Sequence, residues 1–198
     1  MGISRANGAL AMLQEVIRSE RLVVAGLKMA ELGNQSLRKD VLGVQIPAKA
    51  LFTAMGIEHT SIDINGKDGA LPIDLGLPIA QPELVARFDL VTNFGTIQEI
   101  ARQHTAWQNV HRLAKVGGLF LHLVPQAGSW RGKFRIQFDE AFFPALAKCC
   151  SYELLKFERC ESDADSKLFG AVLRKTAHDF PSEAEFLSQV RIEGLAEK

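Results

Sequence analysis

Short apolar runs alternate with amphipathic segments along most of the chain. The apolar runs over 27–32, 59–64, 88–93 and 119–124 predict buried β-strands. A further short strand is expected over 71–75, where Pro72 favours the sheet edge because proline cannot donate a ladder hydrogen bond. Since helical segments separate these strands, the pattern predicts a parallel sheet covered by helices on both faces, a doubly wound α/β fold.

The segments between the strands carry apolar residues at helical spacing. Helices are expected over 7–18, 48–55, 98–114 and 139–148. Pro47 suits the first turn of the second of these helices, and Gly117–Gly118 is expected to stop the third. Ser182 and Glu185 form a capping box that begins a last helix.

The last third of the chain changes pattern. Two apolar runs, over 152–157 and 168–173, are joined through the acidic turn 161–165. About ten residues separate the runs, too few for a helical crossover, so they are expected to pair antiparallel, with 168–173 next to the strand over 119–124. We expect one domain over residues 1–198, made of an N-terminal helical segment (1–25), a core (26–174) and a helical tail (175–198).

Composition narrows the class of protein. Lys plus Arg and Asp plus Glu number 23 each, so no net field would attract nucleic acid or an anionic membrane. The apolar runs are far shorter than the roughly 20 residues that span a bilayer, and the first residues lack the apolar core of a secretion signal. The three cysteines show no metal-ligand spacing. We therefore expect a cytoplasmic protein with reduced thiols and no metal, and a homodimer stays open.

Two acids stand at the ends of successive predicted strands. Glu31 is followed by Gly33, which permits a tight turn and the close approach of a ligand. Asp63 stands near the end of the next strand. Ligands of open α/β sheets bind outside the carboxyl ends of the strands, so both carboxylates are expected at one crevice. Two acceptors there suit a nucleoside, whose ribose offers two hydroxyl donors.

Five parallel strands followed by an antiparallel pair resemble the seven-stranded, Rossmann-like sheet of the class I S-adenosylmethionine-dependent methyltransferases. The resemblance covers about residues 26–174, and its motifs stand in order after the first four strands. It implies that the cofactor is S-adenosylmethionine, that the acceptor is a small molecule, and that the following residues contact the cofactor: Glu31, Gly33, Asn34, Gln35, Asp63, Ile64, Asp74, Leu75, Asn93, Phe94 and Gly95.

The loop after the first strand departs from the family pattern, because Asn34–Gln35 replaces the second glycine. Asparagine tolerates a left-handed backbone better than other non-glycine residues, so the turn itself can survive. Two hypotheses stay open: an enzyme with an altered cofactor loop, or a catalytically silent methyltransferase-like scaffold. A nicotinamide dehydrogenase is disfavoured because no Gly-x-Gly-x-x-Gly follows the first strand.

Methyl transfer depends mainly on proximity and orientation, but a hydroxyl acceptor usually needs a base. Glu99 and His122 are the candidates nearest the ends of the fourth and fifth strands, and His104 is a third. Each has a structural alternative. Glu99 can complement a helix dipole, and His122 can be a core histidine satisfied by backbone.

A mixed aromatic and basic segment follows the fifth strand: Trp130, Arg131, Phe134 and Arg135. The resemblance places the acceptor pocket among loops at this edge, so Trp130 and Arg131 are expected to bind the substrate. An aromatic ring and a guanidinium suit a planar or anionic small molecule. The alternative is a loop packed under its own aromatic rings.

Overall fold

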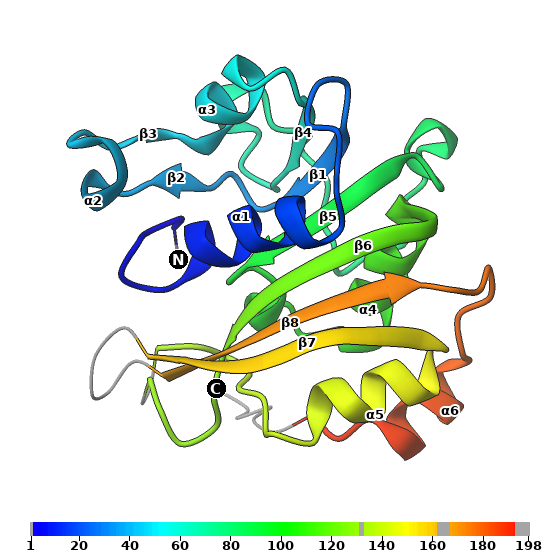
Figure 1. Ribbon diagram of the computed structural model, residues 1–198. Helices are drawn as coiled ribbons and strands as arrows, with labels where there is room; N and C mark the ends of the chain where they lie inside the picture. The colour runs from blue at the N-terminus through cyan, green and yellow to red at the C-terminus, as the bar shows by residue number, and fades with distance from the viewer. Residues whose placement is uncertain (1, 131–132, 162–166, 193–198) are drawn as a thin grey trace.

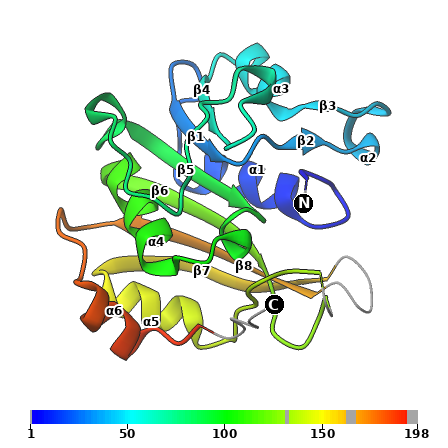
Figure 2. The same cartoon turned by 180° about the vertical axis from the view of Figure 1, so that it is seen from behind.

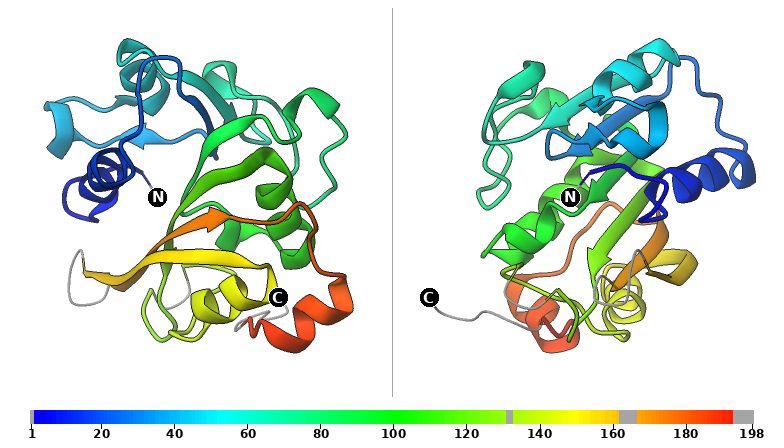
Figure 3. Two further views of the ribbon diagram at one scale, coloured as in Figure 1. Left: turned by 45° about the vertical axis from the view of Figure 1, so that its right-hand side comes forward. Right: turned by 90° about the vertical axis from the view of Figure 1, so that its left-hand side faces the viewer.

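The computed structural model describes residues 2–130, 133–161 and 167–192. Its centre is a six-stranded sheet in the order β4-β1-β5-β6-β8-β7 (Figure 1). The strands are β1 (Lys28–Leu32), β4 (Glu58–Ile62), β5 (Phe88–Phe94), β6 (Ala114–Pro125), β7 (Tyr152–Glu161) and β8 (Lys167–Lys175). Two further short strands, β2 (Ser36–Leu37) and β3 (Ile46–Pro47), pair antiparallel beside α1, well away from α5 and α6 (Figure 3).

Helices cover both faces of the central sheet. They are α1 (Ala9–Ser19), α2 (Lys39–Leu42), α3 (Ala48–Ala54), α4 (Gln103–Leu113), α5 (Phe142–Cys149) and α6 (Glu183–Gln189), with 3-10 turns η1 (Lys67–Gly69), η2 (Pro82–Leu84) and η3 (Ile97–Glu99). Helices α1 and α3 pack on one face, and α4, α5 and α6 cover the other, which faces the viewer in Figure 2. The predicted doubly wound α/β fold is confirmed.

The alternation of side chains along the strands builds a separate core on each face. On β6, Leu119, Leu121 and Leu123 pack towards α1, whereas Phe120 and Val124 pack towards α4 and α5. Neighbouring strands show the same alternation because successive side chains of a strand point to opposite faces. Both faces are therefore buried, as expected for a sheet with helices on each side.

The antiparallel pair at the end of the chain lies where the sequence predicts it. β1, β4, β5 and β6 pair parallel, and β8 pairs antiparallel with β6 on one side and β7 on the other. Leu173 lies opposite both Phe120 on β6 and Leu154 on β7. Most of the predicted acidic turn, 162–165, lies outside the described residues.

The strand predicted over 71–75 is reduced to one parallel bridge between Leu71 and Ile62. The Leu71 amide donates to the Ser61 carbonyl at 2.8 Å, and the Asp63 amide donates to the Leu71 carbonyl at 3.0 Å. The next donor towards β4 would be the Ile73 amide, but it turns back to the Leu71 carbonyl at 2.8 Å, so the ladder does not continue. The segment keeps its expected place at the sheet edge without forming a seventh strand.

The helix predicted over 98–114 is shorter than expected. It breaks after η3 and starts again at Gln103, whose side-chain amide donates to the Ile97 carbonyl at 2.8 Å. It ends at Leu113, where the buried Lys175 ammonium donates to the His111 carbonyl at 2.8 Å. A cation at this end also complements the helix dipole. Gly117–Gly118 therefore does not stop the helix but lies within β6.

Replacing Ser182 by Ala is expected to lower the free energy of unfolding by about 1 kcal/mol, because it removes the N-cap of α6. The Ser182 hydroxyl accepts the Glu185 amide at 3.4 Å, and the Glu185 carboxylate accepts the Ser182 amide at 2.9 Å. Urea unfolding measures the loss. Ser188→Ala, inside the same helix, is the matched control, and an equal loss in both variants would contradict the capping assignment.

Candidate functional site at the carboxyl ends of the strands

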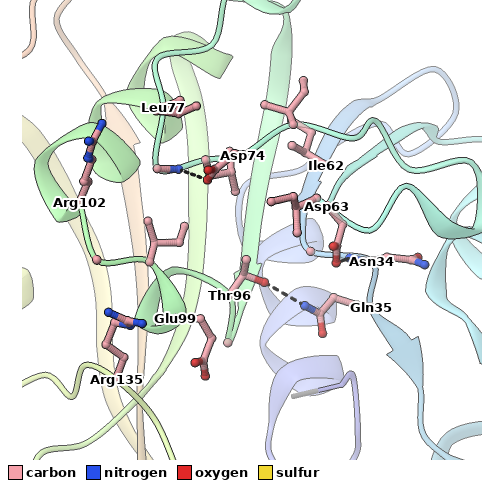
Figure 4. Close-up of a pocket in the computed structure, with 18 residues that line it drawn as sticks. Asn34, Gln35, Ile62, Asp63, Asp74, Leu77, Thr96, Glu99, Arg102 and Arg135 are labelled. Atoms are coloured by element: carbon pink, nitrogen blue, oxygen red, sulfur yellow. Dashed lines mark hydrogen bonds between the residues drawn. The ribbon is translucent and has the colours of Figure 1, made fainter. Parts of the chain in front are cut away.

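A cavity of about 730 Å³ opens at the carboxyl ends of β1, β4 and β5 (Figure 4). Nine residues proposed from the sequence line it: Gly33, Asn34, Gln35, Asp63, Ile64, Asp74, Leu75, Gly95 and Glu99. Thr96 and Arg102 also line it, although no motif of the sequence pointed to them. In the part of the chain that the structure describes, no cluster of His, Cys, Asp or Glu could hold a metal ion, and no helix is long and apolar enough to cross a membrane.

The loop after β1 turns at Gly33, whose backbone has a φ of 79°. A side chain there would collide with the Thr96 hydroxyl and would come within 2.8 Å of the Gln35 amide nitrogen. That hydroxyl donates to the Leu32 carbonyl at 2.7 Å and accepts the Gln35 side-chain amide at 3.2 Å (Figure 4). Gln35 thus joins the β1 loop to the β5 loop, and glycine is required at residue 33.

Asp63 joins the end of β4 to the same loop. One carboxylate oxygen accepts the Asn34 backbone amide at 2.8 Å, and the other accepts the Asn65 amide at 2.9 Å. A carboxylate has about four lone-pair sites, so each oxygen can accept a further hydrogen bond. The Asn34 side chain donates to the Asp68 carboxylate at 2.7 Å. The half-buried Asp63 therefore fixes the loop and keeps acceptor capacity at the cavity.

The segment after the Leu71 bridge forms another wall of the cavity. Asp74 accepts the Gly76 amide at 2.8 Å, and Leu75 is buried. The Asn109 side chain on α4 donates to the carbonyls of Leu75 and Leu77 at 2.9 and 2.8 Å. In the sequence, the signal for this support is Asn109, a polar residue on the buried face of the helix.

No protein-family model and no curated protein sequence matches the chain. Solved structures match its fold. The 1,6-didemethyltoxoflavin-N1-methyltransferase of Burkholderia thailandensis, solved with S-adenosylhomocysteine, matches with a TM-score of 0.63 at 14% identity, over 84% of this chain and 77% of that chain. The N-methyltransferase NodS of Bradyrhizobium japonicum, also solved with S-adenosylhomocysteine, gives 0.60 at 17% identity, over 85% of both chains. The chain has the fold of the class I S-adenosylmethionine-dependent methyltransferases.

The class I methyltransferase fold also carries other reactions. The cyclase SpnF matches with a TM-score of 0.58 at 14% identity, over 84% of this chain and 81% of that chain. The fold therefore does not determine the reaction, which has to be argued from the residues of the site.

Glu31 does not line the cavity, which corrects the prediction that it contacts the cofactor. Its side chain is fully buried on the face of the sheet that packs against α3, because Ala30 and Leu32 face the other side. One oxygen accepts the Gln35 amide at 3.3 Å and lies 3.4 Å from a ring nitrogen of His59. Burial raises the pKa of the Glu31 carboxyl. Glu31 thus supports the loop from beneath.

Asn93 and Phe94, the last two residues of β5, are buried and do not line the cavity, so of the three residues predicted here Gly95 alone reaches it. The Asn93 side-chain oxygen accepts the amides of Thr96 and Ile97 at 3.0 and 3.1 Å. Phe94 packs in the core on the α1 side of the sheet. Both residues shape the β5 loop through the backbone and the core, which corrects their predicted contact with the cofactor.

His122 lies in the core, which corrects its prediction as a base. It is 1% exposed, with its ring centroid 4.9 Å from that of Trp107, and a ring nitrogen lies 3.3 Å from the Asn93 amide. Burial lowers the pKa of His122 to about 3. His104 does not line the cavity either, since its ring nitrogen lies 3.0 Å from the Pro181 carbonyl beside α6. Of the three candidates, Glu99 alone lines the cavity.

The residues of the aromatic and basic segment have different roles, since Trp130 packs within the protein and Arg135 lines the cavity. The Trp130 indole donates to the Lys167 carbonyl at 2.9 Å, and its ring lies 5.2 Å from that of Phe134 and outside the cavity lining. Its predicted role in substrate binding is therefore corrected to packing against Phe134 of its own loop and against the start of β8. Arg131 lies outside the described residues, whereas Arg135 lines the cavity.

Proposed function

We propose that the protein is an S-adenosylmethionine-dependent methyltransferase that acts on a small molecule. The observation that carries this proposal is the convergence of Gly33, Asp63 and Asp74 on one cavity at the carboxyl ends of the strands. The size of about 730 Å³ lies within the roughly 300–1,000 Å³ of small-molecule sites. Structural neighbours solved with S-adenosylhomocysteine support the choice of cofactor.

The residues present fit the cofactor. Asp63 would accept the ribose hydroxyls, and Ile64 and Leu75 would contact the adenine. Asn34 and Gln35 line the cavity, and the amide oxygen of each has no hydrogen-bond partner within the described residues. When bound, S-adenosylmethionine supplies a methyl group activated by its sulfonium. The chain supplies a fixed orientation, which accounts for much of the acceleration in displacements of this kind.

The altered loop supports the enzyme hypothesis over the silent scaffold. The turn at Gly33 is intact, and the Asn34 amide points to Asp63 with a hydrogen bond of 2.8 Å. Gln35 stands in the loop where the family pattern has a second glycine, but the cavity beside it stays open. The substitution therefore stiffens the loop without filling the site.

We place this enzyme in the cytoplasm, as a protein that does not act on nucleic acid. Cys149, Cys150 and Cys160 are free thiols, which suits a reducing compartment. The equal numbers of acidic and basic residues, 23 each, argue against a polyanionic partner. A homodimer is compatible with the fold.

If the acceptor is a hydroxyl, Glu99→Gln is expected to lower kcat by about 10²- to 10⁴-fold, because it removes the base at the cavity. Affinity for the cofactor is expected to stay nearly unchanged, which separates a base from a binding residue. Glu83→Gln is the matched control, since Glu83 also lies in the first turn of a 3-10 helix but outside the cavity lining. Wild-type turnover in Glu99→Gln would leave positioning as the enzyme's contribution.

Methyl transfer itself tests the proposed function. The protein is incubated with S-adenosylmethionine labelled with tritium in its methyl group and with a fraction of metabolite-sized compounds. Label is expected to appear in a small molecule with the wild type and, at a cofactor concentration below saturation, to fall by about tenfold to a hundredfold with Asp63→Ala. If the wild type binds the cofactor but labels no compound, the silent scaffold is the correct hypothesis.

A further inference from the structure

The cavity divides its charges between two sides. Asp63 lies on the side of β4, and Asp74 lies between Asp63 and Arg102; the ribose and adenine are proposed to bind beside these two acids. Arg102 and Arg135 lie on the opposite side from Asp63, and Glu99 lies beside Arg135 (Figure 4). The acidic side belongs to the proposed cofactor, which leaves the basic side for the molecule that the cofactor meets.

Two segments far apart in the sequence contribute these arginines to the lining of one cavity. Arg135 lies in the loop after β6, and the amide of the next residue, Ile136, donates to the Gln98 carbonyl in η3 at 3.1 Å. Arg102 follows η3 and directly precedes α4, whose first turn carries no acid. The positive end of α4 therefore has the same sign as the two side chains.

Neither arginine is paired with a carboxylate of the described residues. Among the described arginines, Arg159 pairs with Glu140, and Arg174 pairs with both Glu20 and Glu153, but neither of these two lines the cavity. Glu99 shares the wall with the two arginines and has an interaction of its own. Two guanidinium groups that line a cavity, with no carboxylate of the described residues paired to them, are suited to carboxylate or phosphate oxygens, which each can bind in a bidentate way.

We propose that the methyl acceptor carries a carboxylate or phosphate group, held by Arg102 and Arg135. This inference rests on the proposed function, because it assigns the acceptor of that reaction. The same anion could in principle come from the methionine carboxylate of the cofactor. The experiment therefore has separate arms for the acceptor and for the cofactor.

The test uses benzoate and benzamide, which have similar shapes but differ in charge. Each is titrated into the free protein and into the protein saturated with S-adenosylhomocysteine, and calorimetry gives the affinity. Benzoate is expected to bind about tenfold more tightly than benzamide, and the double variant Arg102→Gln/Arg135→Gln is expected to lose this preference. Lys133→Gln is the matched control, because Lys133 is a cation of the same loop but lies outside the cavity lining.

Three results would overturn the inference. In the first, the protein binds benzoate no more tightly than benzamide. In the second, Lys133→Gln weakens benzoate binding as much as the double variant does. In the third, the double variant loses affinity for S-adenosylhomocysteine but not for methylthioadenosine, which lacks the carboxylate, so the arginines serve the cofactor. If S-adenosylhomocysteine does not bind the wild type, the proposed function fails, while the free protein still shows whether the arginines select an anion.

Discussion

Asp63→Ala is expected to weaken binding of S-adenosylhomocysteine by about tenfold to a hundredfold, a loss of roughly 1–3 kcal/mol. The variant removes the acceptor proposed for two ribose hydroxyls. It also removes the partner of the Asn34 amide, so the β1 loop loses its hydrogen bond to β4. The first effect weakens the complex directly, and the second leaves the loop of the free protein less well held for binding; calorimetry measures their sum.

Asp68→Asn is the matched control for this experiment. Asp68 accepts the Asn34 side chain at 2.7 Å but lies outside the cavity lining, and asparagine retains an oxygen acceptor. The variant removes a negative charge near the site without touching the ligand, so affinity is expected to change less than threefold, about 0.7 kcal/mol. An equal loss in both variants would assign the effect to general charge or to the loop and not to the ribose.

Acidification from pH 6.5 to pH 4 is expected to destabilise the protein strongly, and His122 contributes most clearly. Burial lowers the pKa of His122 to about 3, whereas an unfolded histidine has a pKa of about 6.5. Between these values the unfolded chain binds a proton that the folded chain excludes. The stability is therefore complete above pH 6.5 and falls with pH, by on the order of 3 kcal/mol at pH 4.

His111 acts in the same direction. One ring nitrogen donates to the His178 carbonyl at 2.7 Å, so in the neutral ring the other accepts the Tyr152 hydroxyl at 2.9 Å. Burial lowers the pKa of His111 to about 4. The buried Glu31 has the opposite effect. Because its pKa is raised, the folded chain binds a proton there more tightly than the unfolded chain does, so acidification stabilises the fold at this residue. Comparing a His122 variant with the wild type cancels the contributions of His111 and Glu31, because both proteins share them.

Urea unfolding of His122→Phe at several pH values between 4.5 and 6 isolates the histidine. The unfolding free energy of the wild type is expected to change more steeply than that of the variant, by one proton, about 1.4 kcal/mol per pH unit. This difference in slope does not depend on the stability of the variant at pH 7. Equal slopes would contradict a neutral, buried His122.

The periodicity of the sequence predicts the fold well because its signals are local. The apolar runs that became β1, β4, β5 and β6 are bounded by turn residues, and the capping box at Ser182 begins α6 where expected. The prediction that Gly117–Gly118 stops this helix was wrong. The last turn of α4 is capped by Lys175, about sixty residues further along the chain. A contact over that separation leaves no local pattern.

The candidate site could be predicted from the sequence in part. Residues just after the strands, such as Gly33 and Asp63, reach the cavity because backbone topology alone brings strand ends together. Residues within the strands, Glu31 and His122, do not reach it, because helices cover the faces to which their side chains point. Arg135 reaches the site through its neighbour's hydrogen bond to Gln98, a long-range contact.

Titration calorimetry of the pure protein with S-adenosylhomocysteine, with NAD as the comparison ligand, tests the central claim most directly. We predict saturable binding of one S-adenosylhomocysteine per chain and no binding of NAD, because Asp63 and the turn at Gly33 converge on the cavity without the glycine pattern of a dinucleotide site. The absence of heat and of a thermal shift with both S-adenosylhomocysteine and S-adenosylmethionine would contradict the claim.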